Sequence, residues 1–300
     1  MSFKNSRMKV AIIGGTGKMG RWFAEFLKQD GKEVIITGRN EKKRLDTQRE
    51  LGVQAGSNIE AIKAADVAVI SLPIDSLEAV AQEIAPHVRP EQIIIDVTSV
   101  KVQPQAFLHH HLNTRLVLGV HPMFGPGARN IRGQNFILTP TSAPENTLAQ
   151  KVKDYLTERD ARVTLMTPEE HDRMMTVILG LSHFIAIVTA DTLLDTTRLG
   201  ETRAISSTTY KALLTLVGSV ISEDPKLYST LQMNFPDITG VENAFLEKTG
   251  AWAKLVRDKN QTEFVKRMQE LKKRFEDNDP DFQNAYRQMY QIAGNPEFTP

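Results

Sequence analysis

A short glycine-rich segment near the start of the chain constrains the fold more than any other part of the sequence. Residues 10–20 read VAIIGGTGKMG, so Gly15, Gly17 and Gly20 stand in G-x-G-x-x-G register directly after an apolar, β-branched run. In that context the motif predicts a strand, a tight turn and a helix whose N-terminus binds a pyrophosphate. We expect Gly15 to allow the turn, Gly17 to let backbone amides approach the phosphates, and Gly20 to let the helix pack closely on the strand.

The first half of the chain alternates apolar runs with helical segments. Strands are predicted at 9–13, 33–37, 65–72, 93–97, 116–120 and 135–139, with the first helix at 20–29. Continuous apolar strands separated by crossover helices form a parallel sheet that is covered on both faces. The pattern therefore predicts an α/β domain with a Rossmann-like, doubly wound parallel sheet, which we place at residues 1–166.

The second half has the spacing of helices. Apolar residues recur at three- and four-residue intervals in segments 169–192, 201–222, 225–232, 238–257 and 262–276. In the last of these, Phe264, Met268, Leu271 and Phe275 form one apolar stripe, which is typical of packing in a helical bundle or a dimer. We therefore expect an all-α domain at residues 167–300, with a helix and a loose end after residue 276.

Composition excludes several classes of function. The 300 residues include 37 Lys plus Arg, 36 Asp plus Glu and no cysteine. A net charge of +1 gives no whole-chain attraction to nucleic acid or anionic lipid, and disulfides and thiolate metal sites are impossible. We expect no metal, nucleic-acid or membrane partner, and a cytoplasmic protein.

The opening MSFKNSR does not resemble a signal peptide. The apolar segment 177–194 is interrupted by polar residues, so we expect a buried helix there rather than a membrane span.

The end of the second predicted strand indicates which dinucleotide is bound. An acidic residue there would bind the ribose hydroxyls of NAD, but the sequence reads Thr37-Gly38-Arg39-Asn40. Arg39 can instead bind a 2′-phosphate through charge-assisted hydrogen bonds, so we expect NADP rather than NAD. The expected cofactor contacts are Gly15, Thr16, Gly17, Lys18, Met19, Gly20, Arg39, Asn40, Lys43, Ser71, Leu72 and Pro73.

Residues suited to acid–base chemistry follow two further strands. Ser99 and Lys101 come after the strand at 93–97, and His121 follows the strand at 116–120 and precedes a proline. The carboxyl ends of strands in a doubly wound sheet border the ligand crevice, where a histidine can act near neutral pH. A structural histidine is equally consistent with the sequence at this position. His171, beside Asp172 on the first helix of the second half, is consistent with a partnered surface pair.

Several motifs together resemble one enzyme family. They are DVTSVK (96–101), GVHPMFGP (119–126), EEHDRMM (169–175), LSHF (181–184), ISSTTYKALLTLVGS (205–219) and EDPKLY (223–228). In this order they are similar to the signatures of prephenate dehydrogenases of tyrosine biosynthesis, over nearly the whole chain. The ITGRN segment and the lack of a fused chorismate mutase resemble the archaeal-type, single-function members.

The resemblance implies an oxidoreductase that converts prephenate to 4-hydroxyphenylpyruvate by oxidative decarboxylation, and a homodimer formed through the helical domain. It implies that His121 binds the 4-hydroxyl group of the substrate and accepts its proton, and that Ser99 shares that hydroxyl. It also implies that His183 lies beside the substrate or the nicotinamide, whereas His171 has a more structural role.

The cations expected for the substrate carboxylates depart from the family pattern. Lys211 and Ser219 stand where better-known bacterial members have arginines, so the resemblance leaves prephenate and arogenate open. We expect Lys101, Arg129 and Lys211 to bind substrate, with Arg132, Arg198 and Arg203 as further cations. Arogenate dehydrogenase or a related hydroxy-acid dehydrogenase is one alternative. A non-catalytic NADP-binding redox sensor is another, because binding a dinucleotide is not itself chemistry.

Overall fold

The computed structural model describes residues 8–294, which form two compact units, one ending at Met175 and the other beginning at Thr176. Residues 1–7 and 295–300 lie outside the described residues. Some predictions concern those residues: the opening segment, the end of the loose tail, and the outer limits of the domains 1–166 and 167–300. The boundary expected at residue 166 stays a prediction.

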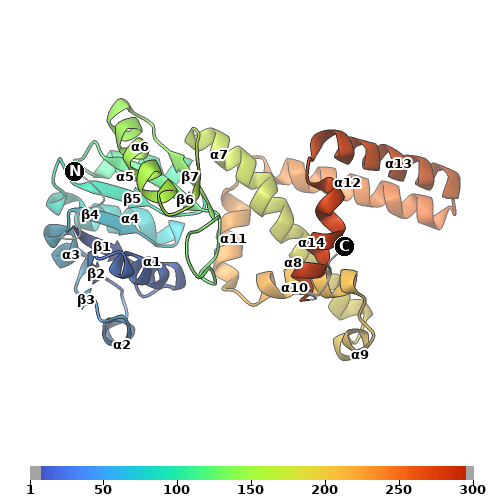
Figure 1. Cartoon of the computed structure of the whole chain (residues 1–300), viewed down its shortest axis with the longest axis horizontal. Coiled ribbons are helices and arrows are strands. Elements are labelled where there is room, and N and C mark those ends of the chain that lie inside the picture. The colour runs from blue at the N-terminus through green and yellow to red at the C-terminus, as the bar shows by residue number, and fades with distance from the viewer. Residues whose placement is uncertain (1–7, 295–300) are drawn as a thin grey trace. The chain divides into compact units, whose positions relative to one another are not determined.

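The first unit is built on one eight-stranded sheet (Figure 1) in the order β3-β2-β1-β4-β5-β6-β7-β8. Neighbouring strands are parallel except β6 and β7, so the doubly wound α/β fold is confirmed. The chain runs from β1 to β2 on one side and continues at β4 on the other, which places a topological switch point at the end of β1. The strands are β1 Lys9–Ile13, β2 Glu33–Ile36, β3 Gln54–Ala55, β4 Val67–Ile70, β5 Ile93–Asp96, β6 Val117–Pro122, β7 Asn135–Thr139 and β8 Arg162–Leu165.

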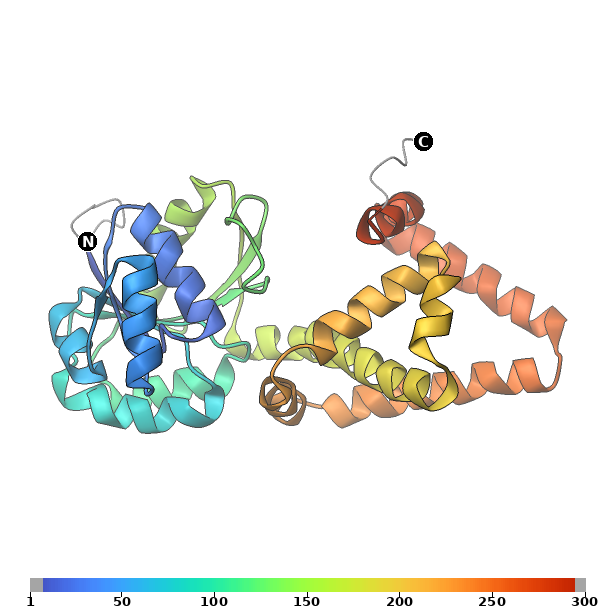
Figure 2. The same ribbon diagram turned by 90° about the horizontal axis from the view of Figure 1, so that it is seen from below.

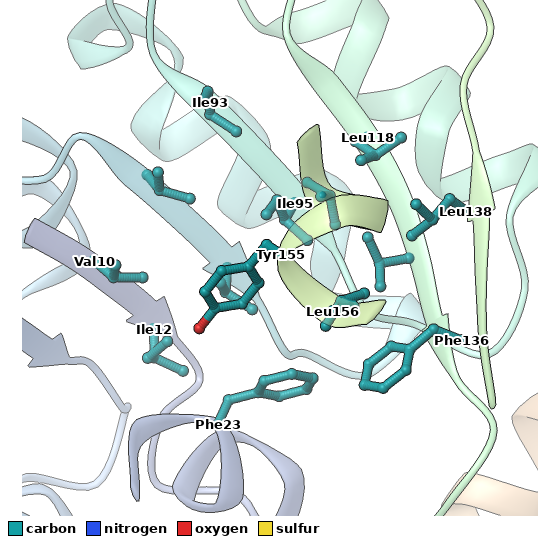
Figure 3. Close-up of a cluster of buried hydrophobic side chains, with 14 of the residues drawn as sticks. Val10, Ile12, Phe23, Ile93, Ile95, Leu118, Phe136, Leu138, Tyr155 and Leu156 are labelled. Carbon is teal, nitrogen blue, oxygen red and sulfur yellow. The ribbon is translucent and has the colours of Figure 1, made fainter. Parts of the chain in front are cut away.

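Helices cover both faces of this sheet. In Figure 3, Phe23 of α1 and Tyr155 and Leu156 of α6 pack over apolar side chains of the strands. On the opposite face, Ala61 of α3, Leu77 of α4 and Leu108 of α5 belong to a second buried cluster. The helices of this unit are α1 Lys18–Gln29, α2 Glu41–Leu51, α3 Asn58–Ala64, α4 Ile74–Ile84, α5 Val102–His111, α6 Ala143–Thr157 and α7 Pro168–Met175, with a 3₁₀ turn at Ala85–His87.

The sheet departs from the sequence-based prediction at its edges. β7 runs antiparallel to β6, because the segment 123–134 between them contains no helix and a parallel return needs a crossover of a dozen or more residues, usually helical. Strands β3 and β8 were missed. The first has only two residues, and β8 is a half-exposed edge strand without a continuous apolar run.

The second unit is all helical, as expected. It comprises a π-helical stretch Thr176–Leu181, α8 Ser182–Thr196, α9 Leu199–Ala204, α10 Thr208–Ile221, α11 Pro225–Asn234, α12 Ile238–Arg257, α13 Gln261–Asn278, a 3₁₀ turn Phe282–Asn284 and α14 Ala285–Ile292. Two helices differ in detail from the prediction. The segment 169–192 contains the π-helical stretch, and 201–222 breaks where the Ser207 side chain accepts the Tyr210 N–H and begins α10.

The apolar segment 177–194 is not the buried helix that we expected. Val177 is 51% exposed and Leu194 is 66% exposed, and Ile178 and Val188 are exposed as well. By length and composition, one helical run among residues 8–294 could cross a membrane: Pro168–Thr196, with mean hydropathy 1.9 and 11% of its most apolar window buried. The segment 177–194 therefore does not lie in the core of a single chain. Figure 2 shows the backbone of the helical second unit from another direction.

The glycines of the two units allow a matched test of packing. A Cβ on Gly20 would lie 2.3 Å from the Gly14 carbonyl oxygen and 2.8 Å from the Gly15 Cα, whereas a Cβ on Gly250 of α12 would meet nothing within 4 Å. We expect Gly20→Ala to destabilise the first unit by about 1–3 kcal/mol. We expect Gly250→Ala to stabilise its helix by about 0.5–1 kcal/mol. Urea unfolding checks both: Trp22 fluorescence in a Trp252→Phe background reports on the first unit, and Trp252 fluorescence in a Trp22→Phe background reports on the second. Equal effects of the two substitutions would contradict the packing of Gly20.

Candidate active site

The glycine loop joins β1 to α1 and packs closely against neighbouring strands. Gly14, rather than Gly15, has the positive φ of the turn, +87°, which corrects the role expected for Gly15. A Cβ on Gly15 would instead lie 2.7 Å from Ile36 Cβ. Gly20 lies against the backbone of Gly14 and Gly15, as its predicted packing role requires. Gly14 also fixes the loop, because its N–H donates to Thr37 Oγ1 at 3.2 Å.

The start of α1 fits a pyrophosphate. Gly17 is exposed, and an added Cβ there would meet nothing closer than the Gly14 carbonyl oxygen at 3.4 Å. Lys18, also exposed, and half-buried Met19 form the first turn of α1, where the N–H groups of a helix lack intrahelical acceptors. No acidic residue stands in that turn. An anion can therefore approach backbone donors and the positive end of the helix dipole without displacing a side chain.

The residues after β2 surround the next part of this site. Thr16 lies against Gly38, where a Cβ would come 2.5 Å from the Thr16 side chain. Arg39 and Lys43 are exposed, and Arg39 has no hydrogen-bond or ion-pair partner within residues 8–294. The Asn40 side chain is engaged elsewhere, since its Oδ1 accepts the Lys43 N–H and begins α2. Arg39 is therefore a cation available here, and the exposed Lys43 adds a second positive charge nearby.

The segment after β4 lies directly against the glycine loop. A Cβ on Gly14 would come 2.2 Å from the Ser71 carbonyl oxygen and 2.8 Å from Leu72 Cδ2, and Pro73 precedes α4. The three segments that follow β1, β2 and β4 thus lie close together. All three contain residues that were predicted to contact the cofactor.

His121 lies at the end of β6 and takes part in a buried chain of hydrogen bonds. Its Nδ1 is 2.8 Å from Nε2 of His171, and Nδ1 of His171 is 2.6 Å from Oδ1 of Asp172. His171 and Asp172 belong to α7 and are buried, so they are not the surface pair that the sequence suggested. Burial is the main cause that holds the pKa of His121 well below its ordinary value, and the nearby Lys101 charge acts in the same direction. The imidazole is therefore neutral at neutral pH and can accept a proton.

The second ring nitrogen of His121 decides whether the residue can act on a ligand. Only 5% of His121 is exposed, so it is more enclosed than the sequence suggested. Its Nε2 has no hydrogen-bond partner in the described part of the chain. Among residues 8–294, two side-chain atoms are both fully buried and without a hydrogen-bond partner: His183 Nδ1 and Gln232 Oε1. Nε2 of His121 is not among these atoms, so it is not completely sealed from solvent.

Lys101 has different surroundings from those expected of a substrate-binding cation. The residue is fully buried, and its ammonium group forms an ion pair with the equally buried Asp96 and donates to the Val120 carbonyl at 3.3 Å. Burial lowers the pKa of Lys101, and the Asp96 carboxylate opposes that shift. We therefore withdraw Lys101 as a ligand for a substrate carboxylate; its charge neutralises Asp96 beneath the site. Ser99, two residues earlier in the same loop, is half-buried.

The remaining predicted residues lie on a loop of the first unit or in the second unit. Arg129 is exposed on the loop 123–134, and Ala128 beside it accepts a hydrogen bond from Trp22 Nε1 at 2.6 Å. Arg132 forms an ion pair with Asp160. In the second unit, Lys211 is exposed on α10.

His183 lies on α8 with its ring centroid 4.7 Å from that of Tyr228. Burial lowers its pKa, and its buried Nδ1 has no partner within residues 8–294. An uncharged ring with one unsatisfied nitrogen is suited to a ligand or a further hydrogen-bond partner.

Family comparisons match both parts of the chain. Residues 23–165 match the nucleotide-binding domain of prephenate dehydrogenase, and residues 167–270 match its dimerization domain. This chain belongs to the prephenate dehydrogenase family. The membership confirms the resemblance that the motifs suggested, and the family is one of oxidoreductases.

Named relatives and solved structures agree with the family. A probable arogenate/prephenate dehydrogenase of Methanocaldococcus jannaschii is 37% identical over 276 residues, 91% of this chain and 62% of that protein. This chain thus spans less than two thirds of that relative's length. A T-protein of Haemophilus influenzae is 25% identical over 96% of this chain and 72% of its own length.

Two solved structures share the fold. Prephenate dehydrogenase from A. aeolicus, in complex with hydroxyphenyl propionate and NAD+, superposes with a TM-score of 0.75 at 20% identity, covering 91% of this chain and 99% of that one. Synechocystis arogenate dehydrogenase gives a TM-score of 0.69 at 18% identity, with 90% and 99% coverage.

Sequence reasoning did not predict the buried roles of two acidic residues near His121. Asp96 ends a buried apolar strand and Asp172 follows a histidine, and both lie within quoted motifs. A charged residue that directly follows three isoleucines in a strand is the signal that could have indicated a buried ion pair at Asp96.

The ion pair beneath the site can be tested by a double-mutant cycle. We expect Lys101→Met to destabilise the first unit by about 3–5 kcal/mol, because it leaves the Asp96 carboxylate buried without a counter-charge. Adding Asp96→Asn should recover part of that loss, since no net charge then remains. Urea unfolding followed by Trp22 fluorescence in the Trp252→Phe background measures each variant. Additive effects of the two substitutions would contradict a direct pair.

Proposed function

We propose that this chain is an NADP-dependent prephenate dehydrogenase. The observation that carries the proposal is the neutral His121 at the end of β6, with Nδ1 hydrogen-bonded and Nε2 open, on the sheet edge that also carries the glycine loop. The family membership and the names of the relatives support this activity.

The proposed reaction needs one proton acceptor at the substrate hydroxyl. Prephenate loses a hydride from the ring carbon that bears the hydroxyl group, and the hydroxyl proton goes to Nε2 of His121. The ring carboxylate leaves as carbon dioxide, and 4-hydroxyphenylpyruvate forms. A bound nicotinamide supplies the hydride acceptor. General-base catalysis of this kind contributes about 10²- to 10⁴-fold in rate.

Other residues would bind and orient the reactants. Gly15, Gly17 and the first turn of α1 would hold the pyrophosphate, and Arg39 would bind the 2′-phosphate of NADP. Ser99 would hydrogen-bond the substrate hydroxyl from the loop after β5. Arg129 on its loop and Lys211 on α10 would bind carboxylates, and His183 would contact the substrate or the nicotinamide. We further propose a homodimer formed through the second unit, whose exposed apolar residues include Val177, Ile178 and Leu194, and a cytoplasmic location.

Replacing the proposed base tests the reaction directly. We expect His121→Asn to lower kcat for prephenate by about 10²- to 10⁴-fold, because no group at that place can accept the hydroxyl proton. Dinucleotide affinity should not change. His110→Asn, an exposed histidine on α5, is the matched control and should keep wild-type kcat. Steady-state assays of dinucleotide reduction measure both variants, and a fully active His121→Asn would remove the proposed base.

The cofactor preference rests on one cation. We expect Arg39→Asp to weaken NADP binding about 10- to 100-fold and to leave NAD nearly unchanged, because only NADP has a 2′-phosphate for the guanidinium to bind. Arg49→Asp makes the same charge change at the far end of α2 and should not discriminate between the two. Calorimetric titration with each dinucleotide gives the affinities. Equal losses for NADP and NAD would contradict the role of Arg39.

A substrate panel separates the alternatives. Wild-type protein assayed with prephenate and with arogenate, each with NADP and NAD, identifies the preferred pair. We expect prephenate with NADP to give the highest kcat/KM. Arogenate preference would make the chain an arogenate dehydrogenase, and no turnover of either substrate would favour the non-catalytic redox sensor.

A further inference from the structure

The hydrogen bonds around His121 extend beyond the proposed base to α7. Asp172 accepts three donors: its Oδ1 accepts the Lys101 N–H at 2.7 Å and lies 2.6 Å from His171 Nδ1, and its Oδ2 accepts the Val102 N–H at 3.0 Å. The two backbone donors belong to the start of α5, whose first N–H groups lack intrahelical acceptors. The position of the carboxylate is therefore fixed from two elements.

This fixed carboxylate determines where the protons of both histidines lie. A carboxylate held by backbone N–H donors is an acceptor, so His171 Nδ1 must carry a proton and donate to it. Burial lowers the pKa of His171 in spite of the neighbouring Asp172, which favours a neutral ring with an unprotonated Nε2. That nitrogen can only accept, and the donor 2.8 Å away is the Nδ1–H of His121. His121 then carries its lone pair on Nε2.

We propose that His171, held by Asp172, is a positioning residue that fixes His121 as the Nδ1–H tautomer and so directs the unprotonated Nε2 towards the ligand. This inference rests on the proposed function only in its catalytic consequence, and the tautomer itself can be observed without substrate. When Nε2 takes up a proton, the Nδ1–H bond to His171 persists, so the resulting imidazolium keeps a hydrogen-bond acceptor within the buried site.

The charged groups around the pair favour this arrangement. Asp172 faces His171 from the same helix, and Lys101 and Asp96 approach from the start of α5 and the end of β5. The Lys101 ammonium is paired with Asp96, while its backbone N–H donates to Asp172. The Asp172 carboxylate thus accepts two backbone N–H donors, and the Nδ1–H of His171 is directed at it as well.

The direct test is the protonation state of each ring nitrogen. In wild-type protein with ¹⁵N-labelled histidine, the spectrum at neutral pH should show a protonated Nδ1 and an unprotonated Nε2 for His121. The difference from the His121→Asn spectrum assigns the signals. In His171→Asn the His121 signals should shift towards the Nε2–H tautomer. A wild-type His121 in the Nε2–H form, or an unchanged spectrum in His171→Asn, would overturn the proposal.

Two substitutions at the same position separate positioning from mere structural support. Asn at 171 can place a donor where Nδ1 stands, near Asp172, but leaves nothing at the place of Nε2. Gln reaches the place of Nε2 and can present an oxygen there, because Asp172 attracts its amide nitrogen. We therefore expect His171→Gln to keep the tautomer and most of kcat, and His171→Asn to lose about 10- to 100-fold in kcat with little change in KM. The reverse order would indicate that His171 only supports Asp172, and would overturn the proposal.

A control and a second readout keep the outcomes distinct. His109→Asn breaks another histidine–carboxylate contact of α5, 2.7 Å from Glu145, and should lower stability without changing the His121 tautomer or kcat. If His109→Asn lost as much kcat as His171→Asn, destabilisation would explain both losses. That result would overturn the positioning role of His171. If the wild type has the expected tautomer but turns over neither prephenate nor arogenate, the proposed function fails while the assignment of His171 stands.

Discussion

The arrangement of the site depends on one buried carboxylate. Asp172 ends the hydrogen-bond chain that begins at His121, and it also accepts the first N–H groups of α5. A buried anion is tolerated only when donors surround it, and three of them do so here. The loop that carries Ser99, the start of α5 and the histidine pair are consequently fixed relative to one another before any ligand arrives. This kind of preorganisation is what an acid–base site requires.

Local patterns predicted most of the nucleotide-binding unit. Six strands, the α1 loop and the edge where the candidate residues gather follow from apolar runs and from the glycine spacing. The pattern failed where stability comes from partners distant in sequence. The strand β8 is stabilised by pairing with β7, which no feature of its four residues reveals, and the direction of β7 depends on the helix-free loop before it.

The residues that gather at this edge of the sheet could be named from the sequence, but their pairings could not. His121, Ser99 and the glycine loop could be named from motifs, but burial of Lys101 with Asp96 depends on three-dimensional packing that joins β5, β6 and α5. A lysine near a strand end has the same one-dimensional signature whether it faces a ligand or an internal carboxylate. The same limit applies to the apolar helix at 177–194, because sequence periodicity does not distinguish a face covered by the same chain from one that a second chain can cover.

The contact between Trp22 and Ala128 links α1 to the loop 123–134. Trp22 belongs to the helix whose first turn would receive the phosphates, and its ring also contacts Phe124, at a centroid distance of 4.9 Å. The segment that carries Arg129 is therefore fastened to α1 by one hydrogen bond and one aromatic contact. A displacement of that helix on dinucleotide binding would carry the arginine with it, which offers a direct physical route for an ordered sequence of ligand binding.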